Sequence, residues 1–278
     1  MRELSQEIGN GAAGLIENLT ILAGLDMLCG AARFSAAIRA SAPELSDEPV
    51  MRLYGARHPL LYLMHGDAVV PNDLVLGESY NCLIISGANT GGKTVLLKTA
   101  GLCALMLRHG LHIPAGPDSR MGIFDPIMAD IGDDQSIQQS LSSFSGQIGV
   151  LKEMMERARS SALILIDEIV VGTNPRQGAS LAQAVVEALA GTGARIIVTT
   201  HYNELKELAS RDERFQNASV SFDPDTLAPA YRLMTGIPGV SYALEIARIY
   251  GIPEDILGRA KALLDEREIS VEALLEKT

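Results

Sequence analysis

The chain has 278 residues, which allows one large domain or one domain with an appendage. Hydrophobic residues make up 47% of it and aromatic residues only 4%, so a sizeable core must be mostly aliphatic. The net charge of −11 excludes a nucleic-acid binder that works by bulk charge, because contacts to phosphates need Lys and Arg.

The N-terminal part is predicted to be helical to about residue 40, because apolar residues recur at helical spacing between Leu15 and Leu28. Ser41–Pro43 ends this pattern, and a polar stretch follows. The expected organisation is a helical segment, a main domain and a tail, over residues 1–48, 49–240 and 241–278.

The main domain is predicted to alternate between apolar strands and helices. Strands are expected at Val50–Tyr54, Cys82–Ile85, Leu163–Ile166 and Arg195–Thr199. Three helices are expected. The first runs from the end of a glycine-rich turn to about Arg108, the second ends at about Ser160, and the third covers Ala179–Ala190. Strands that are apolar throughout and alternate with helices predict an α/β fold, with a mostly parallel sheet flanked by helices.

The last part of the chain is predicted to hold a hairpin and a helical tail. Ala218–Phe222 and Ala230–Met234 flank the turn residues Asp223–Asp225, which is typical of two antiparallel strands. The tail from Ser241 is predicted to be helical, with a break at Gly251–Pro253.

Cysteine usage and hydropathy indicate a cytoplasmic protein. Cys29, Cys82 and Cys103 lie far apart in apolar surroundings, which predicts reduced thiols in the core. We expect no membrane contact, because no apolar run is expected to reach membrane-spanning length and the first residues lack a signal peptide's apolar stretch.

A phosphate-binding loop is predicted at Gly87–Thr94, which fits the pattern G-x-x-x-x-G-K-[ST] between a strand and a helix. Its glycines let backbone N–H groups turn toward phosphate oxygens, and the helix N-terminus adds its dipole. The side chain of Lys93 can reach the β- and γ-phosphates, and the Thr94 hydroxyl can ligate Mg²⁺. The alternative is a glycine-rich turn that binds nothing. The candidate residues for ATP are Gly87, Asn89, Thr90, Gly91, Gly92, Lys93 and Thr94.

Two carboxylates follow the apolar strand Leu163–Ile166. Asp167 and Glu168 are expected at the carboxyl edge of the sheet, where ligands bind in open α/β folds. Asp167 is predicted to hold Mg²⁺ through water, and Glu168 to polarise the attacking water. A solvated strand end is the alternative.

His201 and Ser142 are two further candidates. His201 ends the strand that begins at Arg195, so it is expected at the same sheet edge as Glu168 and within reach of a γ-phosphate or the attacking water. Ser142 belongs to a hydroxyl-rich stretch before a helix, where a simple N-cap and a donor to an anion are both open.

These motifs together resemble the MutS family of ATPases, within the ABC-type branch of P-loop proteins. The resemblance covers roughly residues 20–265, and the match is closest to the bacterial branch that does not serve post-replicative mismatch repair. The matching motifs are Gly87–Thr94, with Ala88 where a proline is usual, then Ser142–Phe144, Asp167–Glu168, Gly172–Pro175 and Thr200–Tyr202. Features of the branch are Asn89–Thr94, Asp130–Asp133, Gln138–Ser142 and Gly236–Gly239.

The resemblance implies a homodimer with two ATP molecules between the subunits. Each site would take its phosphate-binding loop, acidic pair and His201 from one chain, and Ser142 from the other. It also implies that the adenine lies against Val69, Val70 and Leu233, with Asn72 nearby.

The chain also departs from the family pattern. Family members carry a clamp domain before the ATPase, and this branch usually adds a C-terminal nuclease-like domain. We expect both to be missing here, so that DNA is contacted only through domains absent from this chain. Asn174 and Ile169–Val171 replace residues that are usual in the family.

The predicted function is therefore ATP hydrolysis in the dimeric ATPase domain of a MutS-like protein for DNA repair or recombination. One alternative is a non-catalytic module that dimerises with ATP, against which the intact Glu168 argues. A second is an ABC-type ATPase of another pathway, against which Ser142–Phe144 argues, because a transporter would carry a glycine-rich signature there.

Overall fold

The structure is a computed structural model that describes residues 2–88, 91–132, 140–222, 228–239, 244, 247–248 and 250–263, with the backbone alone at 4, 7, 10 and 140–143. The chain divides into two compact units, each assembled from separate stretches. The first comprises Met1–Val75 and Thr99–Phe124, and the second Leu76–Lys98 and Asp125–Thr278. The boundaries expected near residues 48 and 240 stay predictions.

The first unit contains a small sheet with strand order β1-β5-β2-β3. Its elements are α1 (Arg2–Ala37), β1 (Glu44–Ser46), β2 (Met51–Ala56), α2 (Pro59–His65), η1 (Gly66–Ala68), β3 (Asn72–Leu76) and β5 (Arg120–Gly122). β1 pairs with β5 in parallel, and β2 pairs with β5 antiparallel. Met51, Leu53 and Met121 are fully buried in this unit. The strand expected at Val50–Tyr54 is confirmed as β2, which begins one residue later and ends two residues later.

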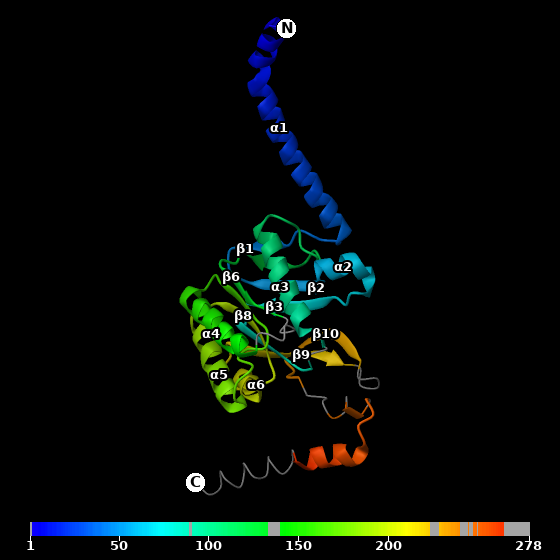
Figure 1. Ribbon diagram of the computed structural model, residues 1–278, viewed down its shortest axis with the longest axis vertical. Helices are drawn as coiled ribbons and strands as arrows, with labels where there is room; N and C mark the ends of the chain where they lie inside the picture. The colour runs from blue at the N-terminus through cyan, green and yellow to red at the C-terminus, as the bar shows by residue number, and fades with distance from the viewer. Residues whose placement is uncertain are drawn as a thin grey trace. The chain divides into compact units, whose positions relative to one another are not determined.

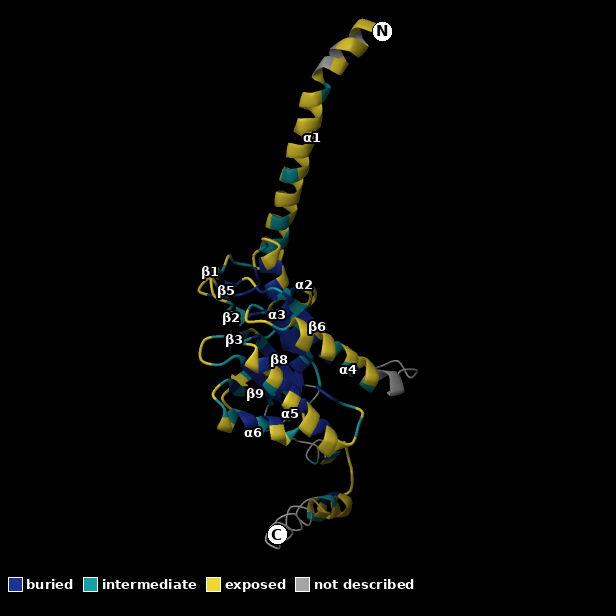
Figure 2. Cartoon of the chain, turned by 90° about the vertical axis from the view of Figure 1, so that its left-hand side faces the viewer, coloured by how far each residue is buried: buried dark blue, intermediate teal, exposed yellow. Residues whose placement is uncertain are grey.

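Helix α1 is exposed along nearly its whole length, as Figure 2 shows. By length and composition alone, its part Gly11–Ala37 could cross a membrane, and the core helix of a soluble protein passes the same test. The expectation that no stretch is long and apolar enough is therefore wrong, because scattered charges do not lower the mean hydropathy sufficiently. Cys29 is exposed on this helix and is no core thiol, whereas Cys82 and Cys103 are buried as predicted.

The second unit is built on a six-stranded sheet with the order β10-β9-β4-β8-β7-β6. Its strands are β4 (Cys82–Ser86), β6 (Ile127–Asp130), β7 (Leu163–Ile166), β8 (Arg195–Thr200), β9 (Phe215–Phe222) and β10 (Pro229–Thr235). All neighbouring pairs from β9 to β6 are parallel, and β10 pairs antiparallel with β9. The mostly parallel sheet and the hairpin are thus confirmed.

Three helices cover one face of this sheet, and Figure 1 shows them gathered on the same side. They are α4 (Ser140–Arg157), α5 (Pro175–Gly191) and α6 (Asn203–Arg211). Buried residues of all three, such as Leu151, Val186 and Leu205, pack with Ile164 and Ile196 of the central strands. Because β4, β7 and β8 are apolar on both faces, they become the centre of the core.

Local sequence explains where the helices around the site begin and end. α3 (Lys93–Arg108) starts directly after the glycine-rich turn and is followed by Gly110 at φ 73°, a conformation that suits glycine at a helix end. α5 begins earlier than predicted, because the Asn174 side chain accepts hydrogen bonds from the N–H groups of Arg176 and Gln177, and Pro175 suits the first helical turn. The tail is helical over residues 254–263.

Candidate active site

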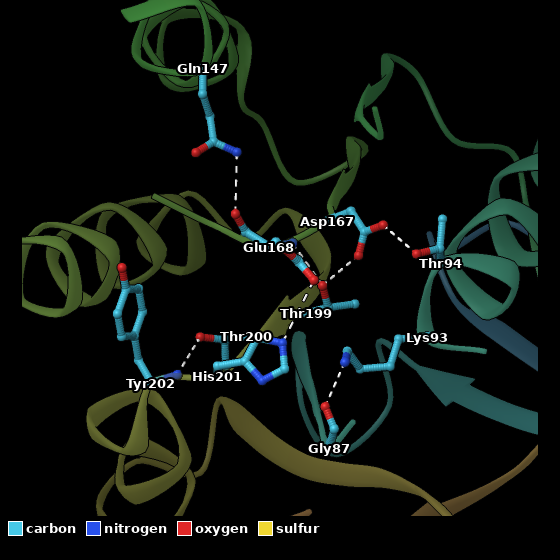
Figure 3. Close-up of polar contacts among 10 residues, drawn as sticks. All are labelled: Gly87, Lys93, Thr94, Gln147, Asp167, Glu168, Thr199, Thr200, His201 and Tyr202. Atoms are coloured by element: carbon cyan, nitrogen blue, oxygen red, sulfur yellow. Dashed lines mark hydrogen bonds and ion pairs between the residues drawn. The ribbon is translucent and has the colours of Figure 1, made fainter. Parts of the chain in front are cut away.

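The candidate site lies where β4, β8 and β7 end. These strands are neighbours in the sheet and run in parallel, so their carboxyl ends meet at one edge. The chain continues from β4 into the glycine-rich loop, from β7 into Asp167 and Glu168, and from β8 into His201. Figure 3 shows Lys93, Asp167, Glu168 and His201 gathered there, as the sequence predicted.

The described residues of the glycine-rich loop include two backbone conformations that require glycine. Gly87 and Gly92 adopt φ values of 119° and 92°, which only glycine adopts without strain. Gly91 N–H donates to the carbonyl oxygen of Ala88 at 3.1 Å, and α3 begins immediately afterwards at Lys93. A helix N-terminus thus opens at the loop, where it favours an anion. Asn89 and Thr90, two predicted nucleotide contacts, lie outside the described residues.

Lys93 is almost completely buried, with 2% of its surface exposed. Its Nζ donates to the carbonyl oxygen of Gly87 at 2.5 Å, so the ammonium folds back over the loop. Burial lowers the pKa of Lys93, although the carboxylates of Glu168 and Asp167 act in the opposite direction. A buried ammonium beside the phosphate-binding loop suits a phosphate group. The negative charge of the phosphate would offset the free-energy cost of burying the ammonium.

Asp167 is held by two hydroxyl groups. Thr94 Oγ1 donates to its Oδ2 at 2.6 Å, and Thr199 Oγ1 donates to its Oδ1 at 2.5 Å. The hydroxyl of Thr94 and the carboxylate of Asp167 therefore lie side by side at the start of α3. Oxygen atoms of this kind are the ligands that Mg²⁺ prefers, usually with water and substrate phosphates completing the shell. The pair fits Mg²⁺, although no group of three His, Cys, Asp or Glu residues forms a metal cluster within the described ranges.

Glu168 and His201 face each other across the site. His201 Nε2 lies 3.6 Å from Glu168 Oε1, and the two side chains are 49% and 37% exposed. Glu168 N–H donates to Thr199 Oγ1 at 2.7 Å, so the same hydroxyl orients both acidic residues. A carboxylate and an imidazole open to solvent, beside a phosphate-binding loop, can orient a water molecule.

The described structure does not test two sets of predicted residues at this site. Ser142 lies in the first turn of α4, where the side chains fall outside the described residues. Of the predicted adenine contacts, Val69, Val70 and Asn72 belong to the first unit and Leu233 to the second. Asn72 Nδ2 donates to the carbonyl oxygen of Val70 at 3.4 Å. The roles of these residues stay predictions.

Sequence reasoning missed several residues that shape the site. Thr199 was predicted only as part of a strand, yet it contacts both acidic residues. Gln147 and Tyr202 hold the backbone after Glu168, through Val170. Gly239 packs against the end of β4, where an added Cβ would lie 2.6 Å from the Gly87 nitrogen. Thr199 could have been found from the sequence, because it is a polar residue at the end of an apolar strand. The contacts of Gln147, Tyr202 and Gly239 can be recognised only in the tertiary structure.

Comparison with known proteins identifies a family for this arrangement. The family described as MutS domain V matches residues 83–268. The chain is 48% identical over 281 residues to an endonuclease MutS2 of Pelotomaculum thermopropionicum, covering 100% of this chain and 35% of that protein. It is 43% identical over 275 residues to an endonuclease MutS2 of Halalkalibacterium halodurans, covering 99% of this chain and 35% of that protein. The corresponding protein of Thermomicrobium roseum is 46% identical over 275 residues, with 95% and 34% covered. The chain thus spans about a third of the length of these relatives.

Proposed function

Because the chain belongs to the MutS domain V family of ATPase domains, we propose that it binds ATP with Mg²⁺ and hydrolyses it to ADP and phosphate. The observation that carries this proposal is the shared sheet edge, where the loop with Lys93, the pair Thr94–Asp167 and the pair Glu168–His201 lie together. Each of the three performs a separate part of phosphoryl transfer to water.

The roles of the residues follow from their positions. The N–H groups of the loop and the ammonium of Lys93 bind the phosphates and stabilise charge that develops on them. Glu168 and His201 orient a water molecule in line with the γ-phosphate, and Glu168 accepts its proton. Thr94 and Asp167 would hold Mg²⁺, which neutralises phosphate charge when bound. Thr199 keeps both acidic residues in place.

We further propose that two copies of the chain enclose two ATP molecules, and that Ser142 of one copy contacts the ATP of the other. The first turn of α4 offers backbone N–H groups and the dipole of the helix to an anion. A contact that forms only in the closed dimer would couple hydrolysis to assembly. A plain N-cap role for Ser142 remains the competing interpretation.

The relatives are named endonucleases, and they are about three times as long as this chain. We therefore propose that the chain is the ATP-hydrolysing part of a MutS-like protein that acts in DNA repair or recombination. ATP binding and hydrolysis would change the conformation of other parts of that protein. DNA contacts would come mainly from segments other than this one.

Phosphate release from Mg-ATP by the wild-type chain and by Lys93→Ala tests the proposal. We expect steady release by the wild type and none by Lys93→Ala, whose far-ultraviolet circular dichroism should stay unchanged because the ammonium of Lys93 contacts the phosphate-binding loop and not the paired strands of the sheet. Lys152→Ala is the matched control, since this exposed lysine of α4 pairs with Glu156 four residues along the same helix. Binding of ATP without any release by the wild type would favour the non-catalytic dimerisation module instead.

A further inference from the structure

The backbone that carries Glu168 is fixed by a partner at every N–H group. Asp167 N–H donates to the carbonyl oxygen of Asp130, and Ile169 N–H donates to that of Thr199. Glu168 N–H donates to the Thr199 hydroxyl. Val170 N–H is different, because it donates at 2.8 Å to a side chain from a helix, Oε1 of Gln147 in α4. Buried N–H groups need such partners, so each of these contacts contributes to the local geometry.

This segment needs the support because its backbone is strained. Glu168 and Val170 adopt φ values of 53° and 58° without being glycine. Left-handed backbone is unfavourable for a β-branched residue such as valine, and it persists only where the surroundings hold it. Val170 is fully buried, and its carbonyl oxygen accepts from the Tyr202 hydroxyl at 2.6 Å. Two side chains therefore hold the same strained residue: Gln147 bonds to the N–H of Val170, and Tyr202 bonds to its carbonyl oxygen.

Of these two side chains, Gln147 makes more contacts, because both the oxygen and the nitrogen of its amide form hydrogen bonds. Its Nε2 donates to Asp130 Oδ2 at 2.8 Å and, at 3.4 Å, to the carbonyl oxygen of Glu168, which Figure 3 shows. A carboxylate accepts only from the nitrogen end, so Asp130 fixes which end of the amide faces Val170. Gln147 thus contacts two of the four residues that follow β7, Glu168 and Val170.

We propose that Gln147 is a positioning residue for hydrolysis: it holds Glu168 and Val170 in their left-handed conformation and so sets the direction of the Glu168 carboxylate. This role rests on the proposed ATP hydrolysis. Gln147 contacts the backbone of this segment and none of the predicted nucleotide ligands that the structure describes. Its loss should therefore slow the chemical step and leave ATP binding unchanged.

The same contact joins the carboxylate to α4. Gln147 lies five residues after Ser142 in that helix, or about 7.5 Å along its axis at about 1.5 Å per residue. A shift of the first turns of α4 would therefore pull on Val170 through one hydrogen bond. The geometry gives the helix that carries Ser142 a direct connection to the residue that would activate water.

The first test is the substitution Gln147→Met, which keeps an unbranched side chain and removes both the donor and the acceptor. The single-turnover rate constant should fall roughly 10- to 100-fold, as when partners that orient site ligands are removed. The Kd for ATP should stay at the wild-type value. A single-turnover rate constant does not depend on the folded fraction, so a plain loss of stability would leave it unchanged.

Hydrogen exchange gives a readout that does not involve activity. In Gln147→Met the amide of Val170 loses its acceptor, so exchange over the peptide that contains it should accelerate. Gln183→Met is the matched control, because the amide of Gln183 donates to Glu187 within α5, at 2.7 Å. The control should change neither the rate constant nor exchange at Val170.

A rescue experiment exchanges the donor and the acceptor in the contact between residues 147 and 130. Gln147→Glu alone keeps the acceptor for Val170 N–H but sets a second carboxylate against Asp130, and it should lower the rate constant. Adding Asp130→Asn restores a donor opposite the new carboxylate, so the double variant should recover most of the activity. Recovery supports positioning through this contact even if Gln147→Met folds poorly.

The outcomes separate the two proposals. A wild-type chain that hydrolyses ATP, with Gln147→Met at the same single-turnover rate, would overturn the role of Gln147 and leave the proposed function intact. A slow Gln147→Met with unchanged exchange at Val170, or an equal loss in Gln183→Met, would also overturn it. A wild-type chain without hydrolysis would overturn the proposed function and this role together.

Discussion

The substitution Thr199→Val removes one hydroxyl from a buried position between the two acidic residues. Thr199 is fully buried, and valine has nearly the same shape, so the core packing should be kept. What disappears is the hydrogen bond to Asp167 Oδ1 at 2.5 Å and the acceptor for Glu168 N–H at 2.7 Å. The loss therefore measures what one hydroxyl contributes to the site.

The magnitude follows from the two contacts. A hydrogen bond to a charged group contributes about 1.5–3 kcal/mol, and a buried N–H left without an acceptor costs about 1–3 kcal/mol. Glu168 is only half-buried, so the lower ends of both ranges apply. We expect the free energy of unfolding to fall by about 3 kcal/mol. ATP hydrolysis should fall as well, because the Asp167 carboxylate and the Glu168 backbone N–H lose their common partner.

Urea unfolding followed by circular dichroism measures the effect as a shift of the midpoint at an unchanged slope. Thr20→Val is the matched control, since Thr20 is exposed on α1 and donates to the carbonyl oxygen of Ile16 at 3.1 Å. Its effect should stay within about 0.5 kcal/mol. A change of less than about 1 kcal/mol for Thr199→Val, with ATP turnover intact, would refute the reasoning, because it would mean that neither contact matters.

Three further predictions follow from the site. Lys93→Met should stabilise the nucleotide-free chain, because burial lowers the pKa of Lys93 and its charge costs free energy below that pKa. The advantage of the variant should shrink as the pH rises toward the ordinary lysine range, which urea midpoints at about pH 7 and about pH 10 would check. Mixing Ser142→Ala with Lys93→Ala should restore ATP turnover if Ser142 acts on the partner's ATP; no recovery in proven mixed dimers would leave Ser142 as a cap. The chain should bind duplex DNA weakly and without preference for a mismatch, given its net charge of −11; tight, mismatch-selective gel shifts would contradict this.

The sequence was sufficient for the centre of the second unit, because its strands are short apolar runs with polar residues directly after them. β7 was predicted to the residue, and the ends of β4 and β8 to within one residue. The parallel order then placed Lys93, Asp167, Glu168 and His201 at one edge, since that position depends only on strand direction.

Short strands and tertiary contacts could not be predicted in the same way. β1 and β5 have three residues each, too few for a periodic pattern. β6 has four residues and was not predicted as a strand. The contact of Gln147 with Val170 joins residues 23 positions apart, and the strained backbone of Val170 contradicts local preference. Such a departure from local rules is typical of a functional site.

Phosphate release from Mg-ATP by Glu168→Gln, compared with the wild type, tests the central claim most directly. The amide keeps the shape of the side chain and removes the proton acceptor, so the variant should bind ATP as the wild type does. Its hydrolysis rate should fall roughly 10²- to 10⁴-fold, the usual contribution of a general base. Turnover by Glu168→Gln at the wild-type rate would contradict the account, because the carboxylate at the end of β7 would then have no part in activating water.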